Sequence, residues 1–217
     1  MLVSAGLDSV VLAAAEARDR QVHPLYIRTG LAWEPQELSA LEQVLARAPL
    51  SGRLAPLTQL DFTVRDLYPA THWALRGTPP AFDTPDEDVY LTGRNVVLLT
   101  KAAIYCAQRG IERIALGPLA GNPFPDATPQ FFAAMEGALS LGLGHRIEVA
   151  APFASMDKSD VIRLGVELGV PLELTLSCMN PREGRHCGQC SKCRERRDAF
   201  AAVGIDDPTT YTVAPLR

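Results

Sequence analysis

The chain has 217 residues, of which 47% are apolar, and a formal net charge of -4. A chain of that length can bury a sizeable core as one domain, and its acidic balance argues against nucleic acid as a partner. With no run of about 18 apolar residues and no room for a leader before Gly6, we expect a cytoplasmic protein that does not enter a membrane.

Short apolar runs alternate with helical patterns along the whole chain. We predict strands at residues 2–3, 22–27, 54–62, 114–117 and 147–150. Apolar residues at helical spacing predict helices at residues 10–18, 35–48, 95–109, 131–141 and 159–168, the third of them ending with Gly110 as its C-cap. Strands that alternate with helices predict an α/β fold with a parallel sheet covered on both faces. Two proline-containing stretches interrupt the alternation: residues 71–88 predict a loop or lid, and residues 117–129 predict a stiff loop that either shapes a site or only connects two elements.

A turn of small residues joins the first strand to the first helix, with the sequence Ser4-Ala5-Gly6-Leu7-Asp8-Ser9. Unpaired N–H groups at a helix start can bind a phosphate when small residues let it approach closely, and the serine hydroxyls can add donors. The Asp8 carboxylate would repel a nearby phosphate unless a Mg²⁺ ion lay between them. The ordinary alternative is that Asp8 only caps the helix. No Gly-Lys-Ser/Thr follows, so the turn is not a Walker loop.

Four cysteines near the C-terminus give the strongest local signal: Cys178, Cys187, Cys190 and Cys193. Four thiolates close a tetrahedral Zn²⁺ shell, and a shell filled by protein is structural rather than catalytic. An iron–sulfur cluster also takes four thiolates and stays open as an alternative. His186 is not needed as a ligand, and Cys106, in an apolar helical run, is expected in the core. The basic run at residues 192–197 predicts a solvated helix face.

Five segments, in chain order, together resemble one known family. Besides the turn at residues 4–9 they are Tyr90-Leu91-Thr92-Gly93-Arg94-Asn95, Pro125-Asp126 with Pro129, the helix start at residues 157–165, and the cysteine spacing. With these segments the chain resembles the 7-cyano-7-deazaguanine synthase family, which belongs to the N-type ATP pyrophosphatases and is related to GMP synthetase and NAD synthetase. The resemblance implies a Rossmann-like fold of the adenine nucleotide alpha hydrolase type. Residues 1–170 would form the PP-loop ATP pyrophosphatase domain, and residues 171–217 a small C-terminal zinc-binding segment.

The family implies a reaction and its partners. ATP adenylates the carboxylate of 7-carboxy-7-deazaguanine and pyrophosphate is released. Ammonia displaces AMP to give an amide, and a second ATP activates the amide so that loss of AMP leaves a nitrile. The implied cofactors are one structural Zn²⁺ per chain and Mg²⁺ with ATP, and the implied assembly is a homodimer. Catalysis would consist mainly of positioning and of charge stabilisation around the α-phosphate.

The resemblance also assigns residues to these steps. ATP would be bound by residues 4–9 together with Tyr26, Ile27, Arg94 and Lys158, and the catalytic residues would be Asp8, Ser9 and Lys158. The substrate base would be bound by Arg94, Asn95 and Asp126. Each assignment has a plainer alternative: an exposed lysine for Lys158, helix capping and a surface ion pair for Arg94 and Asn95, and a simple Pro-Asp turn for Asp126.

Three departures from the family pattern bear on function. Ala5 replaces the first loop glycine and would be strained if that position needs a positive φ. Ala127-Thr128 stands where the family has Cys-Arg, which removes a fork of charged donors, and the loop at residues 117–124 is shorter than usual. The sequence therefore leaves open a related enzyme that uses another carboxylate or stops at the amide, a degenerate nucleotide-binding module without catalysis, and a zinc-stabilised domain that binds no nucleotide. Adenylation of an RNA base for thiolation is disfavoured, because four of the five cysteines are expected to bind metal.

Overall fold

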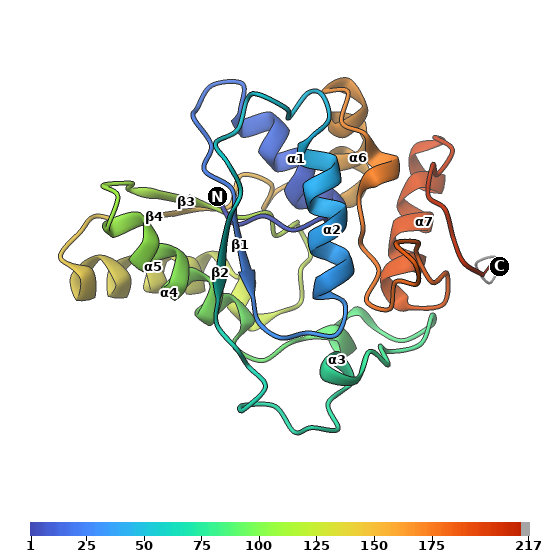
Figure 1. The fold of residues 1–217 in the computed structure, drawn as a ribbon, viewed down its shortest axis with the longest axis horizontal. Coiled ribbons are helices and arrows are strands. Elements are labelled where there is room, and N and C mark those ends of the chain that lie inside the picture. The colour runs from blue at the N-terminus through green and yellow to red at the C-terminus, as the bar shows by residue number, and fades with distance from the viewer. Residues whose placement is uncertain (214–217) are drawn as a thin grey trace.

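The first residues of the chain join two pairs of strands into one sheet (Figure 1). The strands are Leu25–Arg28 (β1), Thr58–Asp61 (β2), Arg113–Ala115 (β3) and Glu148–Ala150 (β4), and β1 pairs in parallel with β2 as β3 does with β4. In the computed structural model, which describes residues 1–213, Leu2 pairs in parallel with Leu25 and its N–H donates to the carbonyl of Ala115 (2.9 Å). The order across the sheet is therefore β2, β1, residues 2–3, β3, β4. The strand order reverses at residues 2–3, and the carboxyl ends of strands at such a switch point form the usual ligand crevice of an α/β sheet.

Helices cover both faces of this sheet. One face carries Leu7–Glu16 (α1), Glu34–Leu45 (α2) and Lys158–Glu167 (α6), with Ser191–Val203 (α7) packed against α6. The other face carries Arg94–Ala107 (α4) and Pro129–Leu143 (α5). The shorter elements are Trp73–Arg76 (α3) and the 3-10 turns Asp86–Val89, Pro125–Ala127 and Leu172–Leu174. The apolar core accordingly has two parts, one on each side of the sheet.

The predicted α/β class with a parallel sheet is confirmed, and each predicted run overlaps an observed strand, bridge or helix. Residues 71–88 are mostly irregular, as expected, but contain α3. The C-cap prediction at Gly110 is wrong: α4 ends at Ala107 with Gln108 as its C-cap, and the left-handed φ of 64° at Gly110 comes two residues later.

Within residues 1–213, no helix combines the length and apolar composition needed to cross a lipid bilayer.

The predicted solvated face at residues 192–197 is wrong for Arg196. Its side chain is 1% exposed, and it donates from Nη1 to Thr175 Oγ1 and from Nη2 to the carbonyl of Leu172, each at 2.8 Å. Asp207 lies 3.7 Å from its Nε. A guanidinium can be buried when its donors are matched. Arg196 therefore ties α7 to the turn at Leu172–Leu174 and to the chain that follows the helix.

Candidate active site and cysteine cluster

The turn at residues 4–9 lies where α1 begins, after the first strand run. Helix bonding starts with Val10, whose N–H donates to the carbonyl of Gly6 (3.1 Å), so the N–H groups of residues 7–9 have no partner within the helix. The Ser9 hydroxyl donates to the Ser4 carbonyl (2.8 Å), and the Ser4 hydroxyl accepts from the Gly6 N–H (3.1 Å). These bonds hold the turn around a helix N-terminus, which is an arrangement that binds phosphate. A bound phosphate would compete with these bonds within the turn for the hydroxyls of Ser4 and Ser9.

Ala5 fits this turn without backbone strain. Within residues 1–213 the only residue other than glycine with a positive φ is Glu183, so the condition under which Ala5 would be strained is not met. Ala5 is fully buried, and its carbonyl accepts from the N–H of Leu176 (2.7 Å). Gly6 also has an ordinary φ, -60°, but a Cβ there would stand 3.1 Å from Ser4 Oγ. A Cβ at position 6 would therefore crowd the Ser4 hydroxyl, which accepts from the Gly6 N–H.

Asp8 and Lys158 meet directly beside this turn. Nζ of Lys158 lies 2.8 Å from Oδ1 and 2.6 Å from Oδ2 of Asp8, and 3.2 Å from Oε1 of Glu195. Burial disfavours the Lys158 ammonium, but the two carboxylates outweigh burial and raise its pKa. Burial likewise disfavours the Glu195 carboxylate, but Lys158 and Lys192 outweigh it and lower the pKa of Glu195 to about 2. The plainer alternatives are therefore wrong: Lys158 is not an exposed lysine, and Asp8 makes no capping bond to α1.

Helices α6 and α7 supply Lys158 and Glu195 to this charge cluster. Asp157 caps α6 through a reciprocal capping box with Asp160, which makes Lys158 the first residue of that helix. Glu195 lies in the second turn of α7. Sequence reasoning missed Glu195, although a signal was present: it is the single acidic residue within the basic run at residues 192–197.

Three adjoining cavities surround the turn and share lining residues. The first, of about 260 Å³, is lined in part by Ser4, Ser9, Tyr26, Ile27, Asn95 and Asp126. The second, of about 240 Å³, is lined in part by Gly6, Leu7, Asp8 and Lys158, and Arg94 lines both. The third, of about 210 Å³, lies between the loop at residues 117–124 and the side chains of Asp8, Lys158 and Lys192. The structure thus brings together the residues predicted for ATP and substrate, except that Ala5 is buried away from all three cavities.

The start of α4 forms one wall of the first cavity. Asp126 is buried; its Oδ2 accepts from the N–H of Asn95 (3.0 Å), and Asn95 Nδ2 donates to the Asp126 carbonyl (2.8 Å). Asp126 therefore caps α4 from a distant loop, and capping by Asn95 itself is wrong because the N-cap residue is Gly93. Burial raises the pKa of Asp126. Among the described residues Arg94 has no ion pair, and its buried Nε has no hydrogen-bond partner.

Two further features of the site were not predicted from the sequence. Glu37, on α2, is buried and lines both the first and the second cavity, and its Oε2 accepts from the Tyr26 hydroxyl (2.7 Å). Burial raises the pKa of both groups. Trp33 and Trp73 stack at the second cavity, with ring centres 5.8 Å apart. The available signal for Glu37 was its place on the predicted helix at residues 35–48, one residue before Leu38; nothing local connects the two tryptophans.

Thr128 has a structural role where the resemblance leads one to expect an arginine. Its Oγ1 accepts from the N–H of Phe131 (3.1 Å), so it is the N-cap residue of α5. A threonine side chain satisfies one of the unpaired N–H groups at a helix start. The segment after Asp126 therefore contributes a helix cap and no cation.

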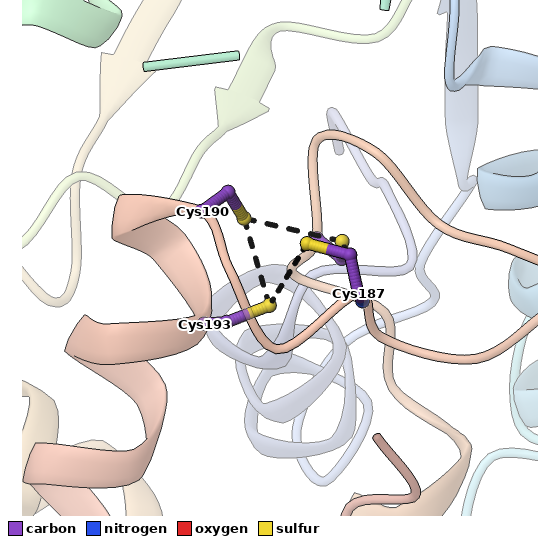
Figure 2. A group of neighbouring side chains, drawn as sticks. Cys187, Cys190 and Cys193 are labelled. Atoms are coloured by element: carbon purple, nitrogen blue, oxygen red, sulfur yellow. Dashed lines mark hydrogen bonds between the residues drawn. The ribbon is translucent and has the colours of Figure 1, made fainter. Parts of the chain in front are cut away.

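The four C-terminal cysteines converge, as the spacing predicted. Their sulfurs all lie within 4.8 Å of one another, and all four residues are buried. Figure 2 labels three of them. The Sγ atoms of Cys190 and Cys193 lie 3.5 Å apart, and those of Cys187 and Cys193 lie 3.9 Å apart. Metal–sulfur bonds of about 2.3 Å in a tetrahedron place thiolates about 3.8 Å apart. The cluster therefore has the size of a four-thiolate metal site with no open position.

The chain around the cluster is shaped to hold these sulfurs. The N–H groups of Asn180 and Cys187 both donate to Cys178 Sγ at 3.3 Å. At Gly188 the φ is +78°, and a Cβ would stand 2.1 Å from the carbonyl oxygen of Val213, so only glycine fits. His186 lies outside the group of ligands and accepts on Nε2 from the N–H of Ser177 (3.1 Å). The fifth cysteine, Cys106, lies on α4 and is buried in the core, as predicted.

Comparison with known proteins identifies the family of this chain. The family model described as "Queuosine biosynthesis protein QueC" matches residues 1–204. A 7-cyano-7-deazaguanine synthase of Anaeromyxobacter dehalogenans is 33% identical over 220 residues, which cover 97% of this chain and 94% of the relative. Proteins of the same name from Methanothrix thermoacetophila and Methanobrevibacter smithii are 34% and 29% identical, and each alignment covers 97% of this chain and 96% of the relative. Because the match extends over nearly the whole length, this chain belongs to the QueC family of queuosine biosynthesis proteins.

Proposed function

We propose that this chain is an ATP-dependent carbon–nitrogen ligase that converts 7-carboxy-7-deazaguanine and ammonia to 7-cyano-7-deazaguanine, releasing AMP and pyrophosphate. The observation that carries the proposal is the contact of Lys158 with Asp8 (2.6 Å) beside a helix N-terminus at the switch point of the sheet. The family model and the names of the relatives support the same reaction.

The reaction twice converts a poor leaving group into a good one. A carboxylate oxygen attacks the α-phosphorus of ATP and pyrophosphate leaves; ammonia then attacks the acyl carbon, and AMP and a proton leave. The amide oxygen attacks a second ATP in the same way, and loss of AMP and of both protons on the nitrogen leaves the nitrile. Both adenylations develop negative charge around the α-phosphate, where fixed cations and oriented N–H groups are most effective.

In this proposal the turn and Lys158 bind the phosphates. The N–H groups of residues 7–9, with the hydroxyls of Ser4 and Ser9, would hold the pyrophosphate part of ATP. Lys158 would remain a cation at neutral pH, because Asp8 and Glu195 raise its pKa. The adenine would lie in the first cavity against Tyr26 and Ile27, at the carboxyl end of β1. Arg94, which lines both cavities, would contact the substrate, and Asn95 and Asp126, which bond to each other at the start of α4, would position Arg94.

Two metals belong to the proposal. The four cysteines would hold Zn²⁺, which would supply rigidity only, because a four-thiolate shell leaves no position for substrate or water. Mg²⁺ would enter with ATP and neutralise phosphate charge. Asp8 is the carboxylate placed to help bind it, and to do so one Asp8 oxygen must exchange its contact with Lys158 for one with the ion.

We further propose a homodimer, a cytoplasmic location, and a division of the chain after residue 170. Exposed apolar side chains lie on the α4 and α5 layer (Val96, Ile104 and Leu141) and suit a self-complementary interface. None of the five cysteines forms a disulfide, which suits a reducing compartment. The cysteine cluster falls entirely within residues 171–217, of which residues 214–217 lie outside the described part of the chain.

A second candidate is a related enzyme that stops at the amide or activates another carboxylate. The observation that favours it is Thr128, which caps α5 where the resemblance leads one to expect an arginine. Strain at Ala5 no longer supports a nucleotide-binding module without catalysis, because the backbone at Ala5 is not in the left-handed region.

Mass spectrometry of the products from purified protein, Mg-ATP, ammonia and 7-carboxy-7-deazaguanine tests the proposal. The expected products are the nitrile, AMP and pyrophosphate, and a reaction without ammonia serves as the control. Amide as the end product would favour the second candidate. Absence of ATP turnover with this carboxylate would contradict the proposal.

A further inference from the structure

The second cavity has an aromatic wall. Trp33 and Trp73 stack with an angle of 9° between their planes, and both line the cavity. Trp33 is 6% exposed, and His72 stacks in turn on Trp73, so packing restrains both indole rings. A restrained aromatic wall of this kind suits the packing of a flat heteroaromatic ring against it. The wall therefore indicates a second planar ligand besides the adenine of ATP.

The polar groups at this cavity define which ring edge would fit. Glu37 is 8% exposed; its Oε2 accepts from Tyr26, and its Oε1 accepts no hydrogen bond from residues 1–213. Arg94 lines the same cavity with a buried Nε that has no partner in the described part of the chain. A carboxylate only accepts and a guanidinium only donates. Together they complement a ring edge that presents N–H donors next to a carbonyl oxygen.

We infer that the second cavity is the acceptor subsite and that Glu37 reads the N1–H and 2-amino edge of a 7-deazaguanine ring packed against the aromatic wall. The inference rests on the proposed function and names the residue that selects its substrate. Arg94 supplies the donor for the ring carbonyl.

The same placement accounts for the chemistry at the other end of the ring. The C7 carboxylate lies on the five-membered ring, away from the edge that Glu37 reads. Asp8 and Lys158 also line the second cavity, so a ring held at Glu37 directs its carboxylate toward the proposed phosphate site. Arg94 and Glu37 line both cavities, which places the acceptor beside an ATP whose adenine occupies the first.

Glu37 also explains how the site keeps adenine out of the acceptor position. Adenine presents a ring nitrogen acceptor where guanine presents N1–H, so it would leave the buried carboxylate unpaired and facing a lone pair. A site built to bind N–H donors strongly rejects a ligand that lacks them. This selection matters for an enzyme that holds ATP in the adjoining cavity.

Intrinsic fluorescence tests the inference directly, because the chain has two tryptophans and both line this cavity. Purified protein is titrated without ATP with 7-carboxy-7-deazaguanine and with its 2-deamino analogue. We expect saturable quenching by the first ligand, and half-saturation by the second at a concentration about 10- to 100-fold higher. Glu37→Gln should bind the first ligand more weakly and bring the two ligands within about threefold of each other. Glu42→Gln, an exposed position on the same helix, should behave like the wild type.

Assay of nitrile formation separates this inference from the proposed function. Product formation by the wild type, combined with an undiminished preference for the 2-amino ligand in Glu37→Gln, would overturn the role of Glu37 and leave the function standing. Equal half-saturation by the two ligands in the wild type would overturn it as well, even if the variant does not fold. If the wild type shows neither turnover nor quenching with 7-carboxy-7-deazaguanine, the proposed function fails and the inference fails with it.

Discussion

Lys158 and Asp8 are 150 positions apart in the chain, yet Nζ of Lys158 lies 2.6 Å from Oδ2 of Asp8. Each belongs to the first turn of its helix, α6 and α1 respectively. Glu195 from α7 reaches the same ammonium at 3.2 Å. Three helices therefore meet at one charged point beside the turn at residues 4–9. Because the pair is partly buried, loss of either partner would leave an unpaired charge in the site.

Lys158→Met should lower kcat for pyrophosphate release by about 100- to 1000-fold, because removing one group that stabilises transition-state charge costs about that much. Arg163→Gln is the matched control, since Arg163 is an exposed cation on the same helix, and it should retain activity. Thermal unfolding of both variants separates loss of function from loss of fold. Full activity of a folded Lys158→Met protein would remove Lys158 from the mechanism.

Elemental analysis of the purified protein should find one Zn²⁺ per chain. Strong chelation, or Cys190→Ser, should lower the Tm and expose residues from about 176 onward to hydrogen exchange, because metal binding and local folding are coupled. Cys106→Ser changes a buried thiol outside the cluster and should leave the metal in place. Iron instead of zinc would indicate the iron–sulfur alternative. An unchanged Tm after Cys190→Ser would contradict the coupling of metal binding to folding.

Glu37→Gln should raise stability at neutral pH while it impairs base recognition. Burial raises the pKa of Glu37 above its ordinary value of 4.5, so the folded state holds this proton more tightly than the unfolded state. As the pH rises from 4.5 to the folded pKa, the unfolded state loses its proton first, and the free energy of unfolding falls. A glutamine side chain does not titrate, so the free energy of unfolding of the variant lacks this dependence on pH. The Tm of the variant should exceed that of the wild type at pH 7, and the difference should close as the pH falls toward 4.5; a difference that grows on acidification would contradict this.

Arg196→Leu should lower the free energy of unfolding by about 3 kcal/mol, because it leaves the buried oxygens of Thr175 and Leu172 without their donors. The neighbouring Arg197 is more exposed, at 30% of its side chain, and Arg197→Leu should cost less than about 1 kcal/mol. Denaturant unfolding with zinc present measures both. Equal effects of the two substitutions would show that burial of Arg196 contributes nothing specific.

Ala5→Gly should not tighten ATP binding, because position 5 has no need of a left-handed backbone. The variant should instead lose about 1 kcal/mol of stability through the greater backbone entropy of glycine in the unfolded state. The shift in Tm produced by Mg-ATP, compared between the two proteins, is the measurement. A larger shift in Ala5→Gly would mean that the nucleotide-bound turn uses a conformation that alanine resists.

Much of the fold and part of the site follow from local chemistry. The alternation of apolar runs determined the α/β class, because strand and helix periodicities are properties of a few consecutive residues. The cysteine spacing predicted the cluster of four thiols for the same reason, since a short loop and the start of α7 carry three of the four sulfurs. The small residues between Ser4 and Ser9 predicted a turn at a helix start, but by themselves they did not distinguish phosphate binding from ordinary helix capping.

Other features depend on residues that only the folded chain brings together. Glu37 and Glu195 belong to different helices, and the local signal at each position does not reveal the cavity that Glu37 lines or the lysine that Glu195 contacts. Asp126 caps α4 from 31 positions away. Arg196 was expected at the surface because charged side chains usually stay in water. It is buried because the chain at Leu172–Thr175 supplies oxygens that replace that water, and such compensation exists only after the distant segments have packed.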